Sequence, residues 1–182
     1  MSAQIDSIDD VHSETLQQLL VGGGPSEQDI VLPERLDRSR LDFSRESLLV
    51  IDDYLNAVHG SGDTAVAISL LTTIWATALY VGEVIRRMAP QRGYEWVRIS
   101  DDQAPAGGTA TGQFDIGTAR ALRARDGELC LPSRAVLRVI LRGCKARTIH
   151  SFALGAIEAA PHLDTPPHLL AKHASAPETV SA

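Results

Sequence analysis

The side chains best suited to chemistry lie near the end of one predicted helix and on the extended stretch that follows it. Tyr80 and Glu83 share one side of the helix, and Tyr94 and Trp96 come next along the chain. A carboxylate, a phenol and an indole near one another could line a small-ligand pocket or form the centre of a protein interface. The structural alternative is an ion pair between Glu83 and Arg87, which have i, i+4 spacing, with core aromatic residues alongside.

A second group of side chains could bind anions. Arginine is frequent between residues 120 and 147, and Arg123 and Arg125 lie on one arm of a predicted hairpin. A basic stripe is the usual beginning of phosphate recognition. Against this use, the chain has a net charge of −6, and the basic stretch contains no aromatic residue that could stack on a base. Anion or nucleic-acid binding is therefore a further alternative and not the leading one.

Other reactive groups have patterns that favour structural roles. The C-terminal stretch holds four possible metal ligands: His162, Asp164, His168 and His173. Their spacings match no standard zinc site. Asp52 and Asp53 are adjacent, and adjacent side chains on a helix point about 100° apart, so we expect them on a solvated face. The chain has no G-x-S-x-G elbow, and its two cysteines, Cys130 and Cys144, have no metal-type spacing. We expect no catalytic residue, metal or cofactor.

The elements that must position these groups include one long apolar segment. Residues 63–87 contain an uncharged run between Asp63 and Glu83. Its length lies at the short edge of the about 17 to 25 residues that a membrane span needs. On a helical projection one side of the segment is weakly polar and includes Thr73. We therefore predict a core helix over 65–85, covered by other elements on most sides, and not a membrane span.

The residues before this segment predict a leader and an amphipathic helix. Residues 1–38 are expected to be a flexible leader with a possible short helix around 11–21. The next helix has Ser44 as its N-cap and Gly60 as its stop signal. Four apolar residues at helical spacing define its buried face: Leu48, Ile51, Leu55 and Val58.

Beyond the long helix the hydrophobic period changes. The stretch GYEWVRIS alternates as a strand does, and Asp126-Gly127 is typical of a two-residue hairpin turn. Ser133 is predicted to cap a helix that ends at Gly143, and SFALGAIEAA predicts a last short helix. The helix predicted between Ser133 and Gly143 has one apolar face, formed by Val136, Leu137, Ile140 and Leu141. The order defines an α+β fold with a helical N-terminal half, a long buried helix, a small antiparallel sheet of three to four strands and two short helices.

Length and composition favour one domain. A chain of 182 residues with 44% hydrophobic residues can form one sizeable core, which we place at 39–160, with a flexible tail at 161–182. The first residues lack the basic and apolar regions of a signal peptide. Together with a cysteine content of only two, which makes a disulfide scaffold unlikely, this favours a cytoplasmic location.

Three stretches together resemble a known group of proteins. They are LDFSRESLLVIDDYL, YVGEVIRR with the tryptophan of YEWV, and LPSRAVLRVILRGCKARTIHSFAL. In this order they resemble small bacterial α+β domains of unknown function, some of which are similar to immunity proteins of interbacterial toxin systems. The resemblance covers about residues 41–155. It implies no catalytic residues, and it favours a binding protein.

The leading hypothesis is a non-enzymatic module that binds another protein, as an immunity or regulatory partner does. The candidate binding residues are Tyr80, Glu83, Arg87, Tyr94, Trp96, Arg123 and Arg125. The first alternative is a small enzyme or ligand receptor with a pocket near Tyr80, Glu83 and Trp96. The second is anion or nucleic-acid binding by the arginine-rich stretch 120–147.

Overall fold

The fold is mixed helix and sheet, which confirms the predicted α+β class. The computed structural model describes residues 8–21, 30–62, 67–98, 120–145 and 147–159. The α-helices in these ranges are α1 (Ile8–Val21), α2 (Ser47–Ser61), α3 (Ala67–Met88), α4 (Pro132–Arg142) and α5 (Ile149–Glu158). The strands are β1 (Glu95–Arg98), β2 (Arg120–Arg123) and β3 (Leu129–Cys130), and the short 3-10 helices are η2 (Pro33–Arg35), η3 (Arg38–Arg40) and η4 (Pro90–Arg92).

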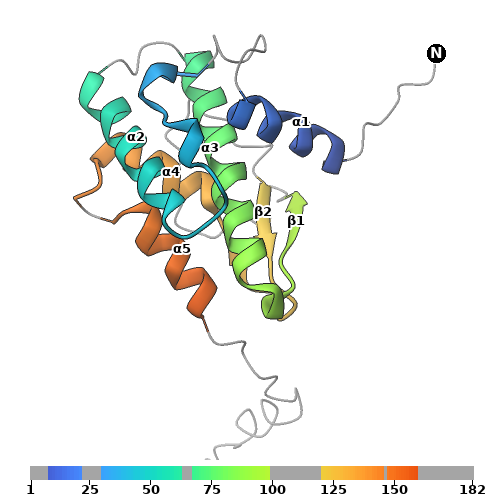
Figure 1. The fold of residues 1–182 in the computed structure, drawn as a ribbon. Coiled ribbons are helices and arrows are strands. Elements are labelled where there is room, and N and C mark those ends of the chain that lie inside the picture. The colour runs from blue at the N-terminus through green and yellow to red at the C-terminus, as the bar shows by residue number, and fades with distance from the viewer. Residues whose placement is uncertain (1–7, 22–29, 63–66, 99–119, 146, 160–182) are drawn as a thin grey trace, which may run out of the picture.

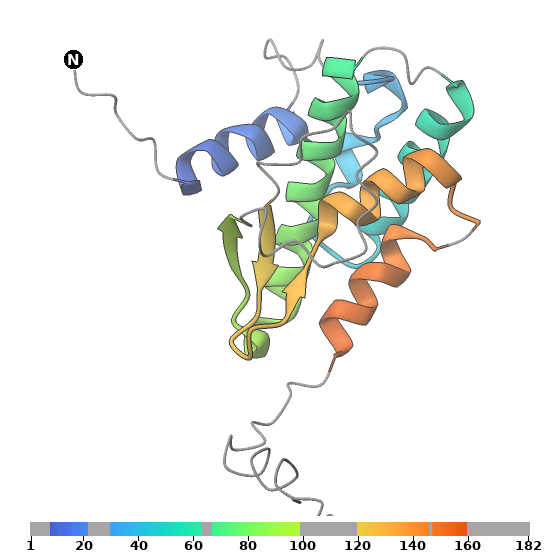
Figure 2. The same ribbon diagram turned by 180° about the vertical axis from the view of Figure 1, so that it is seen from behind.

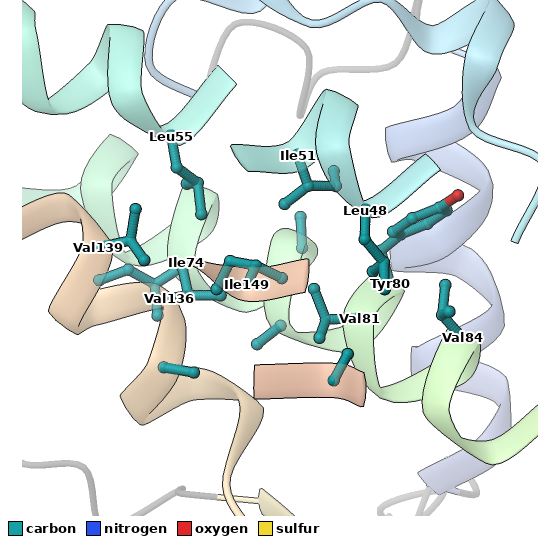
Figure 3. Close-up of a cluster of buried hydrophobic side chains, with 14 of the residues drawn as sticks. Leu48, Ile51, Leu55, Ile74, Tyr80, Val81, Val84, Val136, Val139 and Ile149 are labelled. Atoms are coloured by element: carbon teal, nitrogen blue, oxygen red, sulfur yellow. The ribbon is translucent and has the colours of Figure 1, made fainter. Parts of the chain in front are cut away.

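Helix α3 lies in the middle of the molecule, between α1 and the sheet on one side and α2, α4 and α5 on the other (Figures 1 and 2). Ile74 and Val81 of α3 meet Leu55 of α2, Val136 of α4 and Ile149 of α5 in one hydrophobic cluster (Figure 3). The predicted core helix is therefore confirmed. Among the described residues, no helix has the length and apolar character needed to cross a membrane.

The weakly polar side of α3 is buried as well, because the chain before α2 covers it. The Thr73 hydroxyl accepts a hydrogen bond from the Val31 backbone N–H at 2.9 Å. About two turns along the helix, the Tyr80 hydroxyl accepts a hydrogen bond from the Phe43 N–H at 3.0 Å. The polar positions of the long helix thus satisfy backbone groups that would otherwise be buried without partners.

This contact predicts how two substitutions at one position will differ. Thr73→Val keeps the shape of the side chain but leaves the buried Val31 N–H unsatisfied, so we expect the free energy of unfolding to fall by about 1 to 3 kcal/mol. Thr73→Ser keeps the hydroxyl and loses one methyl group, which should cost about 1 kcal/mol or less. Urea unfolding measures both. Equal losses for the two variants would contradict the proposed role of the hydroxyl.

The N-terminal residues contribute to the same core. Leu19 of α1 is buried, and so are Ile30, Val31 and Leu36 between α1 and η3. Helix α1 packs against α3. The expected helix in the leader is therefore present, and the expected boundary at residue 39 falls within the packed body. The expected tail, 161–182, lies outside the described residues.

Helix α2 buries the predicted face but begins and ends later than predicted. Ser44 does accept a hydrogen bond from the Ser47 N–H at 3.2 Å, yet the helix itself starts at Ser47. At the other end the chain turns at Gly62, whose φ of 65° is a left-handed conformation that glycine adopts without strain. Gly60 is not the stop, because it lies inside the helix.

The three strands form one antiparallel sheet in the order β1-β2-β3. In register, Trp96 lies opposite Leu122, and Leu122 lies opposite Cys130. The predicted hairpin is present, but its loop has three residues, 125–127, and not two: the Ala124 N–H donates to the Glu128 carbonyl, and the Gly127 N–H donates to the Ala124 carbonyl. Gly127 is in a left-handed conformation and follows the central pair of the turn, Arg125 and Asp126.

Helix α4 differs from its prediction in two details. Pro132, not Ser133, opens the helix, since proline needs no N–H partner in the first turn. The Ser133 hydroxyl is buried and has no hydrogen-bond partner within the described part of the chain. The helix buries Val136, Val139 and Ile140, while Leu141 is 60% exposed. The buried face of α4 is therefore rotated by about one residue from the predicted face. The predicted end of the helix at Gly143 is confirmed.

Candidate functional site: an arginine-lined pocket

Glu83, the carboxylate predicted to be functional, is occupied by structural contacts. Its Oε1 accepts hydrogen bonds from the Trp96 indole Nε1 at 3.1 Å and from Arg86 Nε at 3.0 Å. Its Oε2 accepts from Arg86 Nη2 at 3.1 Å and lies 3.7 Å from Arg87 Nε. The side chain of Glu83 is 8% exposed, so these donors balance a nearly buried charge. This geometry favours a structural ion pair at Glu83 over a role for Glu83 in a ligand pocket.

Trp96 reaches Glu83 because residue 82 has no side chain. A Cβ added at Gly82 would lie 2.3 Å from Cζ2 of the Trp96 ring. The indole therefore packs directly on the backbone of α3, with its N–H directed at the next residue. The Gly82-Glu83 pair and Trp96 join β1 to α3.

Tyr80 and Arg87 belong to a neighbouring stack. The Tyr80 hydroxyl donates to Ser47 Oγ at 2.7 Å, and burial raises its pKa above the ordinary value. The ring of Phe43 stacks on Tyr80 at a centroid distance of 4.9 Å. The Arg87 guanidinium lies over the Phe43 ring at 3.6 Å. Phe43 has a φ of 62°, a rare conformation for a bulky residue, and its contacts on both sides hold it there.

The remaining predicted residues lie elsewhere. Tyr94 is buried and donates its hydroxyl to the Ala156 carbonyl at 3.1 Å, which ties β1 to α5. Arg123 and Arg125 are exposed on the hairpin. The side chain of Arg125 lies close to Gly93. The seven predicted residues therefore do not form one site.

The structure contains a pocket of about 460 Å³ between β3, α4 and α5, called the arginine pocket below. Helices α4 and α5 lie side by side where they form it (Figures 1 and 2). Its lining residues are Tyr94, Glu128, Leu129, Cys130, Leu131, Arg134, Ala135, Arg138, Arg147, Phe152, Gly155 and Ala156. Tyr94 is the one member of the predicted set that reaches it. The volume lies in the range typical of ligand sites.

Three exposed arginines give the pocket its charge. Arg134 and Arg138 are one turn apart on α4, and Arg147 precedes α5. No described residue forms an ion pair with any of the three. Arg147 instead lies over the Phe152 ring at 5.9 Å and close to Gly155. The guanidinium groups are therefore available to an anion from outside.

The one carboxylate among the lining residues already has a cationic partner within the fold. Glu128 pairs with Arg92, whose side chain is 1% exposed and which also binds Asp126 at 3.1 Å. Burial acts to lower the pKa of Arg92, but its hydrogen bonds with Tyr94 and Glu128 and the charge of Asp126 outweigh burial and raise it. Arg92 is shared by Asp126 and Glu128, so this group keeps one net negative charge beside the three positive charges of the pocket arginines.

A buried carboxylate holds α5 in position beside the pocket. Asp52 of α2 accepts hydrogen bonds from the backbone N–H groups of Ile149 at 2.6 Å and His150 at 3.0 Å. Thr148 accepts from the Ser151 N–H at 3.0 Å. These acceptors satisfy the first three N–H groups of α5, which a helix leaves without internal partners. The predicted solvated role of Asp52 is therefore wrong, while Asp53 is exposed as expected.

Two thiols give the protein a sensitivity to high pH. Burial, with a smaller effect from the charge of Glu128, raises the pKa of Cys130 from its ordinary value of 9.0 to about 12. Burial, with a smaller effect from Asp52, raises the pKa of Cys144 from 9.0 to about 11. The neutral thiol is favoured in the folded state, so its contribution to stability is complete below pH 9. That contribution is lost as the pH rises from 9 toward 11 and 12.

We therefore expect the free energy of unfolding to fall between pH 9 and pH 11. Replacing Cys130 with alanine should make this decline shallower, because one of the ionising groups is then absent. Urea unfolding at pH 8, 9, 10 and 11 measures the slope for both proteins. The same slope in the variant would show that Cys130 does not contribute.

The pocket was not predicted, although all its lining residues except Tyr94 lie within 128–156, because it forms only where α4, α5 and β3 pack together. The density of arginine in 120–147 indicated the correct stretch of the chain. The predicted binding residues were Arg123 and Arg125, however, whereas the arginines that line the pocket are Arg134, Arg138 and Arg147. Within the described residues, no group of three His, Cys, Asp or Glu side chains could hold a metal ion, and the histidine-containing tail lies outside them. Comparison with models of protein families, with curated proteins and with solved structures finds no significant match.

Proposed function

We propose that this protein is a non-enzymatic binding module that holds an acidic segment of a partner protein in the arginine pocket. The observation that supports the proposal is the presence of three arginines around one concavity without an acidic partner among the described residues. Arginine is enriched at protein interfaces because its planar group forms paired hydrogen bonds with carboxylates. Leu129, which is 37% exposed at the pocket, adds an apolar contact.

A protein partner fits the charge distribution better than a nucleic acid does. The chain is acidic overall, with a net charge of −6, and a long polyanion would meet repulsion away from the pocket. A short acidic segment needs only the local positive charge. The pocket aromatics, Tyr94 and Phe152, are engaged with Ala156 and Arg147. Because of these contacts, the two rings are not available to stack on the bases of a single-stranded nucleic acid.

An enzymatic function has less support. Glu83 is surrounded by donors, Tyr80 is buried against Ser47, and burial raises the pKa of Cys130 to about 12, so that its thiol stays neutral at pH 7. These groups have roles in packing that leave none of them free for proton transfer or nucleophilic attack. The proposal places the protein in the bacterial cytoplasm as an immunity-type or regulatory partner, in line with the resemblance described above.

The proposal is tested with a fluorescein-labelled hexaglutamate peptide and fluorescence anisotropy at low salt. The wild-type protein should bind it. Replacing Arg134, Arg138 and Arg147 together with glutamine should weaken binding by about threefold to 150-fold, as expected for three ion pairs of about 0.2 to 1 kcal/mol each. Arg142→Gln is the matched control, because Arg142 is exposed on the same helix but does not line the pocket.

Two results would contradict the proposal. Equal binding by the wild type and the triple variant would place the contact elsewhere. Tighter binding of a labelled oligothymidine than of hexaglutamate, with the same dependence on the three arginines, would favour the nucleic-acid alternative.

A further inference from the structure

Resting on the proposed function, we infer that the arginine pocket selects an extended partner segment in which two acidic residues flank an apolar one. The inference concerns the sequence pattern of the partner, beyond its negative charge. It follows from the spacing of the arginines on α4 and from the lining residues contributed by α5 and β3.

The spacing on α4 matches alternate residues of an extended chain. Arg134 and Arg138 are four residues apart on one helix, which corresponds to about 6 Å along its axis. In an extended segment, residues i and i+2 project to the same side about 6.5 Å apart. Two acidic side chains at alternate positions can therefore each meet one arginine, whereas adjacent acidic residues point to opposite sides and present only one.

The other lining residues suit the residue between the two acids. Helix α5 contributes Phe152, Gly155 and Ala156, and β3 contributes Leu129 and Cys130. A side chain at i+1 points away from the α4 arginines, and the apolar side chains of Leu129, Phe152 and Ala156 form part of the surface available there. Burying a leucine or similar side chain against that surface is favourable by the usual hydrophobic gain. Arg147, held over Phe152, remains for the carboxylate or main-chain carbonyl of a further residue.

A helical partner segment with acids at i and i+4 would also place its two carboxylates about 6 Å apart along the axis. It would not direct the residue next to an acid to the opposite side of the segment, as an extended chain does. The peptides below distinguish the two conformations.

Two labelled peptides of equal composition and charge test the inference: Gly-Ser-Glu-Leu-Glu-Ser-Gly and Gly-Ser-Glu-Glu-Leu-Ser-Gly. The first should bind the wild-type protein about threefold to fivefold more tightly, the value of one additional ion pair. The preference should disappear in Arg134→Gln and persist in Arg142→Gln. A third peptide, alanine-rich and helical with glutamates at i and i+4, should bind more weakly than the first.

The possible failures separate the two proposals. Equal binding of the two short peptides, with loss of both in the triple arginine variant, would overturn the spacing rule and leave acidic recognition intact. Equal or tighter binding of the helical peptide would overturn the extended conformation. If neither these peptides nor hexaglutamate bound, the proposed function would fail together with the inference.

Discussion

Replacing Asp52 with alanine is expected to lower the free energy of unfolding by about 2 to 4 kcal/mol, because two backbone N–H groups at the start of α5 would lose their acceptor. Asp52 is 6% exposed, so water cannot readily take the place of the carboxylate. The loss is a large part of the about 5 to 15 kcal/mol that typically stabilises a domain.

The adjacent residue provides the control for this variant. Asp53→Ala removes the same charge from the same helix at an exposed position, and its effect should stay within about 0.5 kcal/mol. Chemical unfolding of the three proteins gives the comparison. Similar losses for both variants would mean that charge, and not the contact with α5, explains the effect.

The second large effect is expected at Gly82. Helix propensity alone predicts that Gly82→Ala stabilises α3 by about 1 kcal/mol. The structure predicts the opposite sign, because the new methyl group would overlap the Trp96 ring. Displacing the ring also breaks its hydrogen bond to Glu83, so we expect a net loss of about 1 to 3 kcal/mol, as for other overpacked sites.

Two further variants isolate the clash. Gly60→Ala places a methyl group where no atom lies within 4 Å, and it should be neutral or stabilising by up to about 1 kcal/mol. Gly82→Ala combined with Trp96→Ala should cost less than the sum of the single changes, because the overlap is then absent. Stabilisation by Gly82→Ala alone would contradict the packing described for Trp96.

The helices were predictable from sequence because their periodicity reflects one shared core. Leu48, Ile51 and Leu55 of α2 recur at helical spacing, and all three are fully buried. The position of the hairpin was predictable because Gly127 supplies the left-handed residue of the loop, although the loop has three residues and not the predicted two. In both cases the information lies within a few residues of the element.

Contacts between distant residues account for what was missed. Asp52 meets Ile149, 97 positions later in the sequence, and periodicity cannot separate such a carboxylate from a solvated one. The Thr73 hydroxyl donates to the Ser69 carbonyl of its own helix, as helical threonines commonly do, so the sequence did not show that it also accepts from the Val31 N–H. The arginine pocket depends on how α4 and α5 pack together, so neither helix alone predicts it.

The most direct test is to locate the residues at which an acidic segment binds. In a nitrogen-15 correlation spectrum of the wild-type protein, titration with Gly-Ser-Glu-Leu-Glu-Ser-Gly should shift the backbone amides of Arg138, Phe152 and Gly155 around the arginine pocket. The indole N–H signal of Trp96, held by Glu83, should stay in place. Shifts confined to Trp96 and its neighbours Arg86 and Arg87, with unchanged pocket amides, would contradict the central claim.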